Sequence, residues 1–521
     1  MTEQSSETGI SQILPLAAKR VAENVRGLIA SGRAREALLC LAQLDAIGSD
    51  SPEVVKLTKA ALLIDLASKL DDPDLAKKGI SLMKEVGEDG LPEEAKHAYL
   101  YNLGNGCGAL HYIKRIPKGV QRSIDEDFRS AKECYQKAMS LRGKSTESTS
   151  VLYTNYGILL RDVGRHVEEI EAYDDALRVT PNFGLALRNK ATGLRWYSKL
   201  VDPPTERSAL VEARHLLKLT MKAGLAAARQ AKVKEELAKL DRVLGKPKAP
   251  AHRHTHHVAH SAIERKYISF CVVNRLYLHP CPVSTHEAYR DTLSVRIPTP
   301  EPDEHLELRS NALALIKQEY IAARFLLFAY RCHAPDLSFV DTGTFLPSVE
   351  DRKGQIYAQF LIFSFRAAYS VLDKIGCFLN DFCRLGDKSD SVRFQEDLFL
   401  KKGSLREGLR RYDGTELSAL FDLAREFSKE QPLFSLRDLR NKLEHRCVAL
   451  GRQPTEREGK RTIEGDAHSP TVVYGLNEDD LYEDSLRLFK AVRAAIFYLF
   501  HFTRTSIQQR IKELQRDTEQ A

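Results

Sequence analysis

One short segment of the sequence carries side chains that could break a phosphodiester bond. It follows Pro432 and contains an arginine and a histidine five positions apart, Arg440 and His445. A guanidinium can hold the non-bridging oxygens of a phosphate and their developing charge, and an imidazole can move a proton near neutral pH. Such a pair could cleave a phosphodiester without a metal ion.

This segment is predicted to form a helix with one buried side. Ser435 followed by Asp438 is typical of a capped helix start. Apolar residues recur at helical spacing, at Leu436, Leu439 and Leu443. The polar side chains lie off this stripe. An open alternative is a solvated helix face, where Arg440 pairs with Glu444 one turn later and stabilises the helix by about 0.2–0.5 kcal/mol.

Three segments carry a family resemblance. Arg440-Asn441-Lys442-Leu443-Glu444-His445 resembles the Arg-Asn-x-x-x-His signature of the HEPN superfamily, helical domains many of which are metal-independent ribonucleases. Residues 365–380 are similar to the long helix on which such domains carry a supporting polar residue. Residues 264–280 resemble the entry segment of HEPN domains that follow tetratricopeptide repeats. The resemblance spans residues 262 to 515.

The resemblance implies cleavage of RNA by transesterification, leaving 2′,3′-cyclic phosphate ends. His445 would be general base or acid, Arg440 would stabilise the pentacovalent transition state, and Asn441 would orient the phosphate or the histidine. Asp373 is expected to support the site, with Asn380 as the alternative on the same helix. Flanking phosphates would be held by further basic residues, namely Lys442, Arg446, Lys401, Lys402, Arg410 and Arg411. No metal or other cofactor is expected.

The resemblance also implies a homodimer with two Arg/His sets facing across a shared cleft. The layout looks like that of bacterial toxins or defence effectors, in which the repeats sense a protein or peptide. The alternative is a non-catalytic dimeric adaptor that binds a protein partner through its repeats. A nucleotide-binding module would need a Gly-rich loop followed by Lys-Ser/Thr, which the sequence lacks.

Bulk properties fit a protein of the cytoplasm. A chain of 521 residues is too long for one core, and its net charge of +7 permits nucleic-acid contact without requiring it. The nine cysteines include no Cys-x-x-Cys pair, so reduced thiols are expected. The N-terminus lacks a signal-peptide pattern, and the most apolar stretch, residues 494–500, is too short to span a membrane.

Helical repeats fill the first half of the chain. After a polar tail, 1–12, residues 13–244 are predicted to form a tetratricopeptide-repeat solenoid. Residues 153–182 match the repeat pattern well, apart from Glu169, where the pattern has a small alanine. A second copy starts at residue 100 and resumes at residue 131 after an insertion rich in basic residues, which is expected to be a loop of the kind that binds ligands.

The second half is predicted to be a separate helical domain. Residues 245–262 are predicted to be a linker rich in proline and histidine. Its histidines are expected to be incidental, with adventitious metal binding as the alternative, and they are His252, His254, His256, His257 and His260. Residues 263–515 are expected to form the HEPN-like bundle, followed by a tail, 516–521. The fold class is therefore all-α, a helical solenoid followed by a helical bundle.

Overall fold

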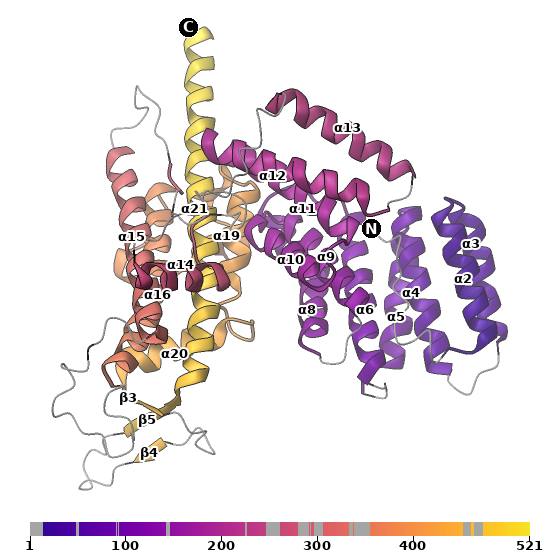
Figure 1. Ribbon diagram of the computed structural model, residues 1–521, viewed down its shortest axis with the longest axis horizontal. Helices are drawn as coiled ribbons and strands as arrows, with labels where there is room; N and C mark the ends of the chain where they lie inside the picture. Colours follow the sequence, from indigo (N-terminus) through magenta and orange to yellow (C-terminus); the bar gives the residue numbers. More distant parts are fainter. Residues whose placement is uncertain are drawn as a thin grey trace. The chain divides into compact units, whose positions relative to one another are not determined.

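The architecture comes from a computed structural model, shown in Figure 1. It describes residues 14–47, 52–89, 91, 93–141, 146–224, 227–245, 261–279, 291, 293–295, 306–332, 337, 355–451, 460–462 and 472–520. Contacts divide the chain into a first unit, Met1–Lys199 with Ala209–Pro247, and a second unit, Leu200–Ser208 with Lys248–Ala521. The five linker histidines lie outside the described residues.

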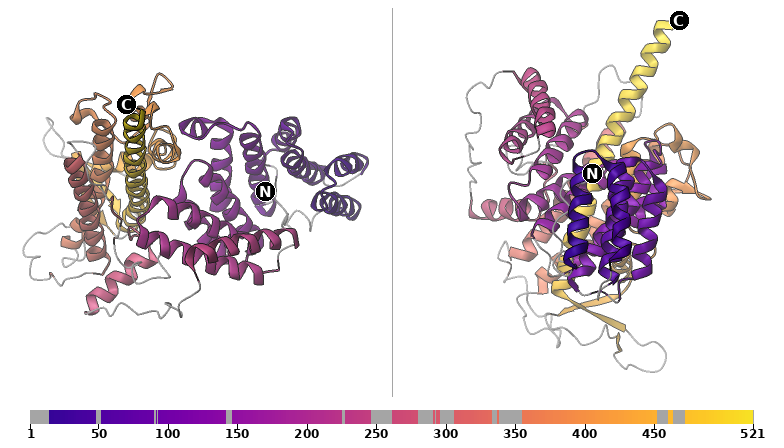
Figure 2. Two further views of the ribbon diagram at one scale, coloured as in Figure 1. Left: turned by 90° about the horizontal axis from the view of Figure 1, so that it is seen from above. Right: turned by 90° about the vertical axis from the view of Figure 1, so that its right-hand side faces the viewer.

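Helix pairs stack side by side through the first half, so the predicted solenoid is confirmed (Figures 1 and 2). The pairs are α2 (Leu16–Ala30) with α3 (Ala34–Leu41), α4 (Pro52–Leu70) with α5 (Pro73–Val86), α6 (Glu93–Ile113) with α8 (Glu126–Ser140), and α9 (Thr146–Asp162) with α10 (His166–Val179). Helix α11 (Gly184–Tyr197) packs on α10, and α12 (Pro203–Lys222) and α13 (Ala227–Leu244) follow it in the chain.

A glycine lies against a buried tyrosine in two of these pairs. A Cβ atom on Gly157 would lie 2.6 Å from Cε1 of Tyr173, and one on Gly104 would lie 2.7 Å from Cε1 of Tyr135. The small residue therefore lets the two helices of each pair approach closely. Because the same contact recurs, the insertion between Gly104 and Tyr135 lengthens the connection without changing the packing.

Glu169 departs from the repeat pattern but is accommodated inside the solenoid. Its side chain is fully buried, and one carboxylate oxygen lies 2.8 Å from Nδ1 of His166. The other oxygen lies 3.7 Å from Nε of Arg161. A Cβ atom on Gly193 of α11 would lie only 2.9 Å from that second oxygen. The space for the carboxylate is thus created by a glycine on the next helix.

Basic residues of the insertion form ion pairs with acidic residues of the solenoid, although the sequence alone predicted a loop of the kind that binds ligands. The ring nitrogens of His111 lie 2.7 Å from Asp125 and 2.7 Å from Asp162. Lys114 pairs with Asp125, and Arg122, at the short helix α7 (Val120–Ile124), pairs with Asp162. These contacts tie the insertion to the end of α9.

The second half forms a bundle of long helices, as predicted. Its helices are α14 (Ala262–Val273), α15 (Leu306–Cys332), α16 (Gln355–Phe382), α17 (Glu396–Phe399), α18 (Glu407–Arg410), α19 (Thr415–Arg425), α20 (Phe434–His445) and α21 (Glu478–Gln520). Helices α15, α16 and α21 run side by side (Figures 1 and 2). The apolar residues 494–500 of α21 are all buried, which places this stretch in the core of the bundle.

A buried arginine anchors the segment that precedes α15. Arg324 of α15 is 1% exposed and donates to both carboxylate oxygens of Asp291, at 2.9 and 2.6 Å. It also donates to the backbone carbonyl of Leu276 and to the hydroxyl of Tyr267, which lies on α14. One side chain therefore ties the entry segment to the bundle.

Two small β-elements are additions that the sequence did not predict. The hairpin β1 (Leu400–Lys401) and β2 (Ser404–Leu405) is antiparallel. After α20, β3 (Cys447–Gly451) pairs in parallel with β5 (Val472–Asn477), which also pairs with β4 (Lys460–Thr462). Short runs of two to six residues within a mainly helical sequence give little periodic signal.

Candidate functional site

Helix α20 presents the arginine and the histidine as the sequence suggested, but it starts differently. The leucines of the predicted stripe, Leu436, Leu439 and Leu443, are buried. The helix begins at Phe434 with Leu433 at its cap position, and no side chain caps it. The capping role predicted for Ser435 is therefore wrong, and burial of the leucine stripe is what fixes the helix.

The arginine of the motif faces the long helix α16. Nη2 of Arg440 lies 3.7 Å from a carboxylate oxygen of Asp373, and the guanidinium lies 5.7 Å from the centre of the Tyr369 ring. Both α16 residues are one helical turn apart, so they meet the same side chain. The side chains of Arg440 and Asp373 are 25% and 19% exposed, which leaves the pair open to a ligand.

Glu444 takes a partner on α16 and not the one expected within its own helix. Its carboxylate accepts a hydrogen bond from Arg366 at 2.6 Å, and this bond lowers the pKa of Glu444. The alternative of a simple Arg440–Glu444 pair is therefore replaced by two contacts between helices, Arg440 with Asp373 and Arg366 with Glu444.

His445 is exposed at the last position of α20. Among the residues that the structure describes, it has no hydrogen-bond partner, so its imidazole is available for proton transfer. Asn441 is also exposed, and its side-chain oxygen accepts a hydrogen bond from Nη1 of Arg440 at 3.3 Å. Lys442 pairs with Asp438 at 3.1 Å, and Arg446 is exposed just after the helix.

The two candidates for the supporting residue are placed differently. Asn380 donates to the carbonyl of Asp387 at 2.9 Å and accepts from its N–H at 3.1 Å, so it closes the turn after α16. Asp373 faces Arg440 instead. The geometry therefore brings Asp373, and not Asn380, to the motif.

The basic segment 401–411 is not brought to the motif. Arg406 hydrogen-bonds to Asp387 and to the carbonyl of Leu385, beyond the C-terminal end of α16. That end, Phe382, lies nine residues after Asp373, which is about 14 Å along a helix. The predicted RNA contacts of Lys401, Lys402, Arg410 and Arg411 would therefore involve RNA well away from Arg440.

Two arginines near the motif were missed by sequence reasoning. Arg437 lies one turn before Arg440 on α20, and Arg393 belongs to the segment that folds back onto α16. Burial raises the pKa of Tyr369 to about 12, an effect that Arg437, Arg440 and Arg393 oppose. All three guanidinium groups are therefore close enough to the Tyr369 hydroxyl to lower its pKa. A signal in the sequence is Gly376, because a glycine inside a helix often marks a place where another chain segment packs closely on that helix.

The carboxyl group of Asp373 is perturbed by its surroundings. Burial raises its pKa, while Arg393, Arg440 and a hydrogen bond from the backbone N–H of Phe394 act in the opposite direction. The net shift is upward. Perturbed acidic groups of this kind are common at functional sites.

The described parts of the chain contain neither a candidate metal centre nor a helix suited to span a membrane. No group of three or more His, Cys, Asp or Glu side chains there could hold a metal ion. Within the same residues, none of the helices has the length and apolarity that crossing a membrane requires.

Comparisons with known proteins identify the region around the motif. Residues 306–506 match the model of the LA2681-like HEPN family, which confirms the resemblance for that part of the chain. A solved structure titled "Functional Characterization of Pseudomonas Aeruginosa pilF" shares 18% identity with this chain, covering 45% of this chain and 88% of its own, with a TM-score of 0.29. No protein of curated function matches the chain.

Proposed function

Because residues 306–506 form a HEPN domain of the LA2681-like type, we propose that the chain is an endoribonuclease with Arg440 and His445 as its catalytic pair. The observation that carries this proposal is the placement of Arg440 on α20. Its guanidinium is held at 3.7 Å from Asp373, half-buried, while His445 stays exposed at the end of the same helix. A fixed cation and a free imidazole are the two groups that the reaction needs.

The proposed reaction uses the 2′-hydroxyl of the RNA as nucleophile. Its oxygen bonds to the adjacent phosphorus and gives up its proton to a base, the bond from phosphorus to the 5′-oxygen breaks, and that oxygen takes a proton. The products carry a 2′,3′-cyclic phosphate and a 5′-hydroxyl. His445 transfers protons, and Arg440 stabilises the extra negative charge on the pentacovalent phosphorus. Asn441 and Asp373 position the guanidinium.

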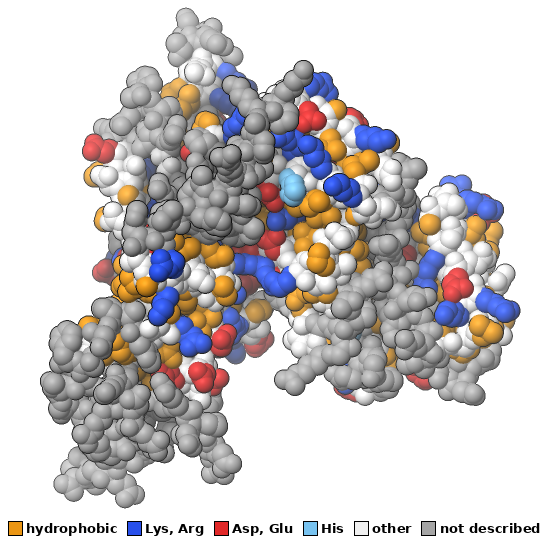
Figure 3. Space-filling view, in the orientation of Figure 1, with side chains coloured by type: hydrophobic (Ala, Val, Ile, Leu, Met, Phe, Trp, Pro, Cys, Tyr) orange, Lys and Arg blue, Asp and Glu red, His pale blue; other side chains and the backbone are white. Residues whose placement is uncertain are grey.

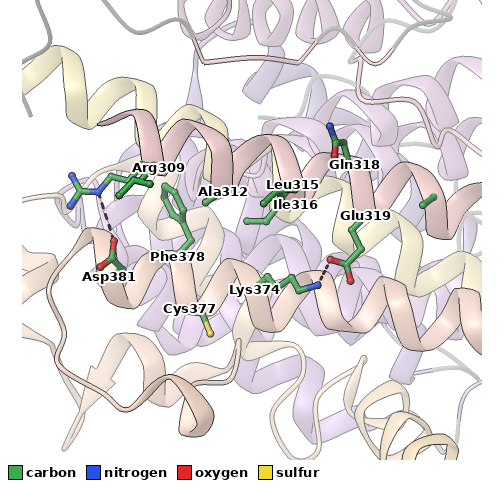
Figure 4. A pocket seen from close by; sticks show the side chains of 12 residues that line it. Arg309, Ala312, Leu315, Ile316, Gln318, Glu319, Lys374, Cys377, Phe378 and Asp381 are labelled. Carbon is green, nitrogen blue, oxygen red and sulfur yellow. Dashed lines mark hydrogen bonds and ion pairs between the residues drawn. The ribbon is translucent and has the colours of Figure 1, made fainter. Parts of the chain in front are cut away.

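We also propose that the active form is a homodimer, because one helix offers one imidazole and the reaction needs both a base and an acid. A groove of about 780 Å³ between α15 and α16 supports this (Figure 4). Its lining includes Leu308 and Leu315, which are 68% and 63% exposed. Lys374 also lines the groove and directly follows Asp373, so the groove adjoins the site.

The charges on the groove suit a second copy of the same chain. Arg309 pairs with Asp381 at one end, and Glu319 pairs with Lys374 at the other (Figure 4). If two α15 helices pack antiparallel about a two-fold axis, Arg309 of one protomer lies beside Glu319 of its partner. Figure 3 shows basic side chains among apolar ones on the visible face of this unit, over α14 and α16.

The dimer is tested by the mass of the protein in solution. Light scattering is expected to give twice the chain mass for wild type and the chain mass for Leu315→Asp, since a carboxylate at the centre of an apolar face is not tolerated. A Leu39→Asp variant is the control, because Leu39 is 78% exposed on the first unit. A monomeric wild type would exclude the dimer.

The biological role proposed is a regulated toxin or defence effector of the cytoplasm. The solenoid would sense a protein or peptide, and the bundle would cut RNA once released. Seven cysteines, Cys40, Cys107, Cys134, Cys271, Cys332, Cys377 and Cys383, have free thiols, as is usual in a reducing compartment. The rival proposal is a non-catalytic adaptor, in which the bundle only dimerises.

An RNA cleavage assay in excess EDTA separates these proposals. Wild type is expected to give cyclic-phosphate ends, while Arg440→Ala and His445→Ala give intact RNA. An Arg516→Ala variant changes an exposed arginine far along α21, to which no role in RNA binding is assigned, and is expected to cut the same bonds as wild type. If wild type leaves RNA intact and its overexpression is harmless to cells, the adaptor is favoured and the ribonuclease is refuted.

A further inference from the structure

Three arginines from two separate segments surround the same part of α16. Arg440 pairs with Asp373 and lies above the Tyr369 ring. Arg437 lies three residues earlier on α20, hence one turn away on the same side of that helix. Arg393 comes from the segment between α16 and α17.

The position of Arg393 is fixed by close packing of its neighbours. Val392 and Phe394 on either side of it are 3% and 2% exposed. A Cβ atom on Gly376 would lie 3.2 Å from Cγ1 of Val392 and 3.4 Å from the carbonyl carbon of Arg393. This chain segment therefore lies directly on α16, less than one turn from Asp373, and the backbone N–H of Phe394 donates to that carboxylate.

The Arg393 side chain is exposed although its backbone is anchored. Its Nη1 donates to the carbonyls of Val392, at 2.7 Å, and Asp390, at 3.1 Å. No described residue receives a hydrogen bond from its remaining N–H groups. The guanidinium is thus preorganised by its own turn, with donors left for a ligand.

The carboxylates near these arginines do not balance their charge. Glu444 is committed to Arg366, and Asp438 to Lys442. Asp373 is left for Arg393 and Arg440, and the other carboxylate nearby is that of Asp390, three residues before Arg393. Three guanidiniums are therefore accompanied by two carboxylates. An excess of half-exposed guanidinium groups suits the oxygens of a phosphate, which accept paired hydrogen bonds from the planar fork.

We propose that Arg393 and Arg437, beside Arg440, form a subsite for a second backbone phosphate, the one next to the cleaved bond in single-stranded RNA. The choice of RNA as the ligand rests on the proposed function. The subsite holds the strand in register with Arg440 and His445, and its contacts go to phosphate and not to bases, so it adds affinity without sequence preference. Tyr369 is 5% exposed and its ring lies below the Arg440 guanidinium, while the Arg437 guanidinium lies 5.9 Å from the centre of the Phe434 ring.

The subsite is tested by binding, with His445→Ala as the parent protein so that RNA stays intact. A fluorescein-labelled 10-nucleotide RNA would be titrated in rising salt and followed by anisotropy. Arg393→Gln and Arg437→Gln are each expected to weaken binding about tenfold, and to lower the slope of log K against log salt by about 0.7, the value for one phosphate of a single strand. Arg516→Gln, an exposed arginine far along α21, is the matched control.

Each outcome has a separate meaning. Equal binding by Arg393→Gln, Arg437→Gln and the control would overturn the subsite, as would a parent protein that binds no RNA. Displacement of the RNA by poly-aspartate at equal charge would assign the arginines to an acidic peptide instead. Cleavage is measured separately on wild type, so a failure of the ribonuclease proposal with arginine-dependent RNA binding intact would leave the subsite standing. Circular dichroism melts check that each variant is folded.

Discussion

Because Glu169 packs against Gly193, the effect of Gly193→Ala on the free energy of unfolding should change sign when Glu169 is replaced by alanine. Replacing an interior helix glycine with alanine ordinarily stabilises a protein by about 0.5–1 kcal/mol. At Gly193 the new Cβ would lie 2.9 Å from a carboxylate oxygen of Glu169, which is fully buried and held by His166. Overpacking of this kind costs about 1–3 kcal/mol. Gly193→Ala should therefore destabilise wild type but stabilise the Glu169→Ala variant.

The assay is a double-mutant cycle in urea, followed by tryptophan fluorescence. The chain has one tryptophan, Trp196, and it lies on α11 beside His166, so its signal reports on this part of the solenoid. The expected coupling free energy is about 1–3 kcal/mol, equal to the relieved overpacking. Gly27→Ala is the matched control, because nothing lies within 4 Å of a Cβ atom there, and it should stabilise both backgrounds equally. If Gly193→Ala stabilises wild type as Gly27→Ala does, the inferred clash does not exist.

Three further predictions concern the second unit. Arg324→Met removes the guanidinium from Asp291, whose carboxylate keeps the hydrogen bond from the backbone N–H of Leu278. The change should lower the unfolding free energy by about 3–5 kcal/mol in urea followed by circular dichroism, and a loss below about 1 kcal/mol would contradict the anchoring role. Burial raises the folded pKa of Asp373 above its unfolded value, so the ionised group subtracts stability as pH rises through the folded pKa. The stability of Asp373→Asn relative to wild type should therefore increase from pH 4 to pH 8 in urea titrations, and a decrease would reverse the assigned sign. Burial raises the pKa of the Cys271 and Cys383 thiols to about 12, so mass spectrometry should find both unlabelled by iodoacetamide at pH 8 until the protein is unfolded.

The parts of the fold that depend on local periodicity could be predicted from the sequence. The leucine stripe of α20 needed only its spacing, and the long helices followed from the same 3.6-residue pattern. The Gly157–Tyr173 contact belongs to a repeat motif that specifies both partners. The resemblance implied Asp373 or Asn380 as a supporting residue, but the pairing of Arg440 with Asp373 could not be predicted, because the distance between two helices is a tertiary property.

The rest depends on contacts that leave no periodic signal. Arg393 reaches the site only because its segment turns back onto Gly376. The parallel pairing of β3 with β5 joins strands about twenty residues apart around a segment with no repeating pattern. Glu169 can be buried only because Gly193 on the next helix leaves room for its carboxylate. The larger side chain at one position and the missing side chain at the other can be related only once the two helices are placed in space.

Two charged clusters of the chain differ in how far their basic residues are neutralised. In the insertion of the solenoid, the bases His111, Lys114 and Arg122 are matched by Asp125 and Asp162, with further pairing of Lys114 to Asp127 at 2.8 Å. Arg115 pairs with Asp71 in the same way, so Lys118 is the one basic residue between α6 and α8 with no acidic partner among the described residues. The contacts join elements of the fold. Such a cluster has little positive charge left for a polyanion, although its sequence is basic.

The cluster at α16 has the opposite balance. Asp373 faces Arg393 and Arg440, and Arg437 adds a third guanidinium beside Tyr369. Burial makes the Asp373 carboxylate costly to ionise. Guanidiniums held close together without enough counter-charge repel one another, so their arrangement lowers stability unless an anion joins them. A phosphate would supply the missing charge at the point where the motif needs its substrate. The paired basic residues of the insertion therefore stabilise the fold, whereas Arg393 and Arg437 are the better candidates for RNA contact. RNA binding there should raise the thermal stability of the second unit, and excess salt should abolish that gain.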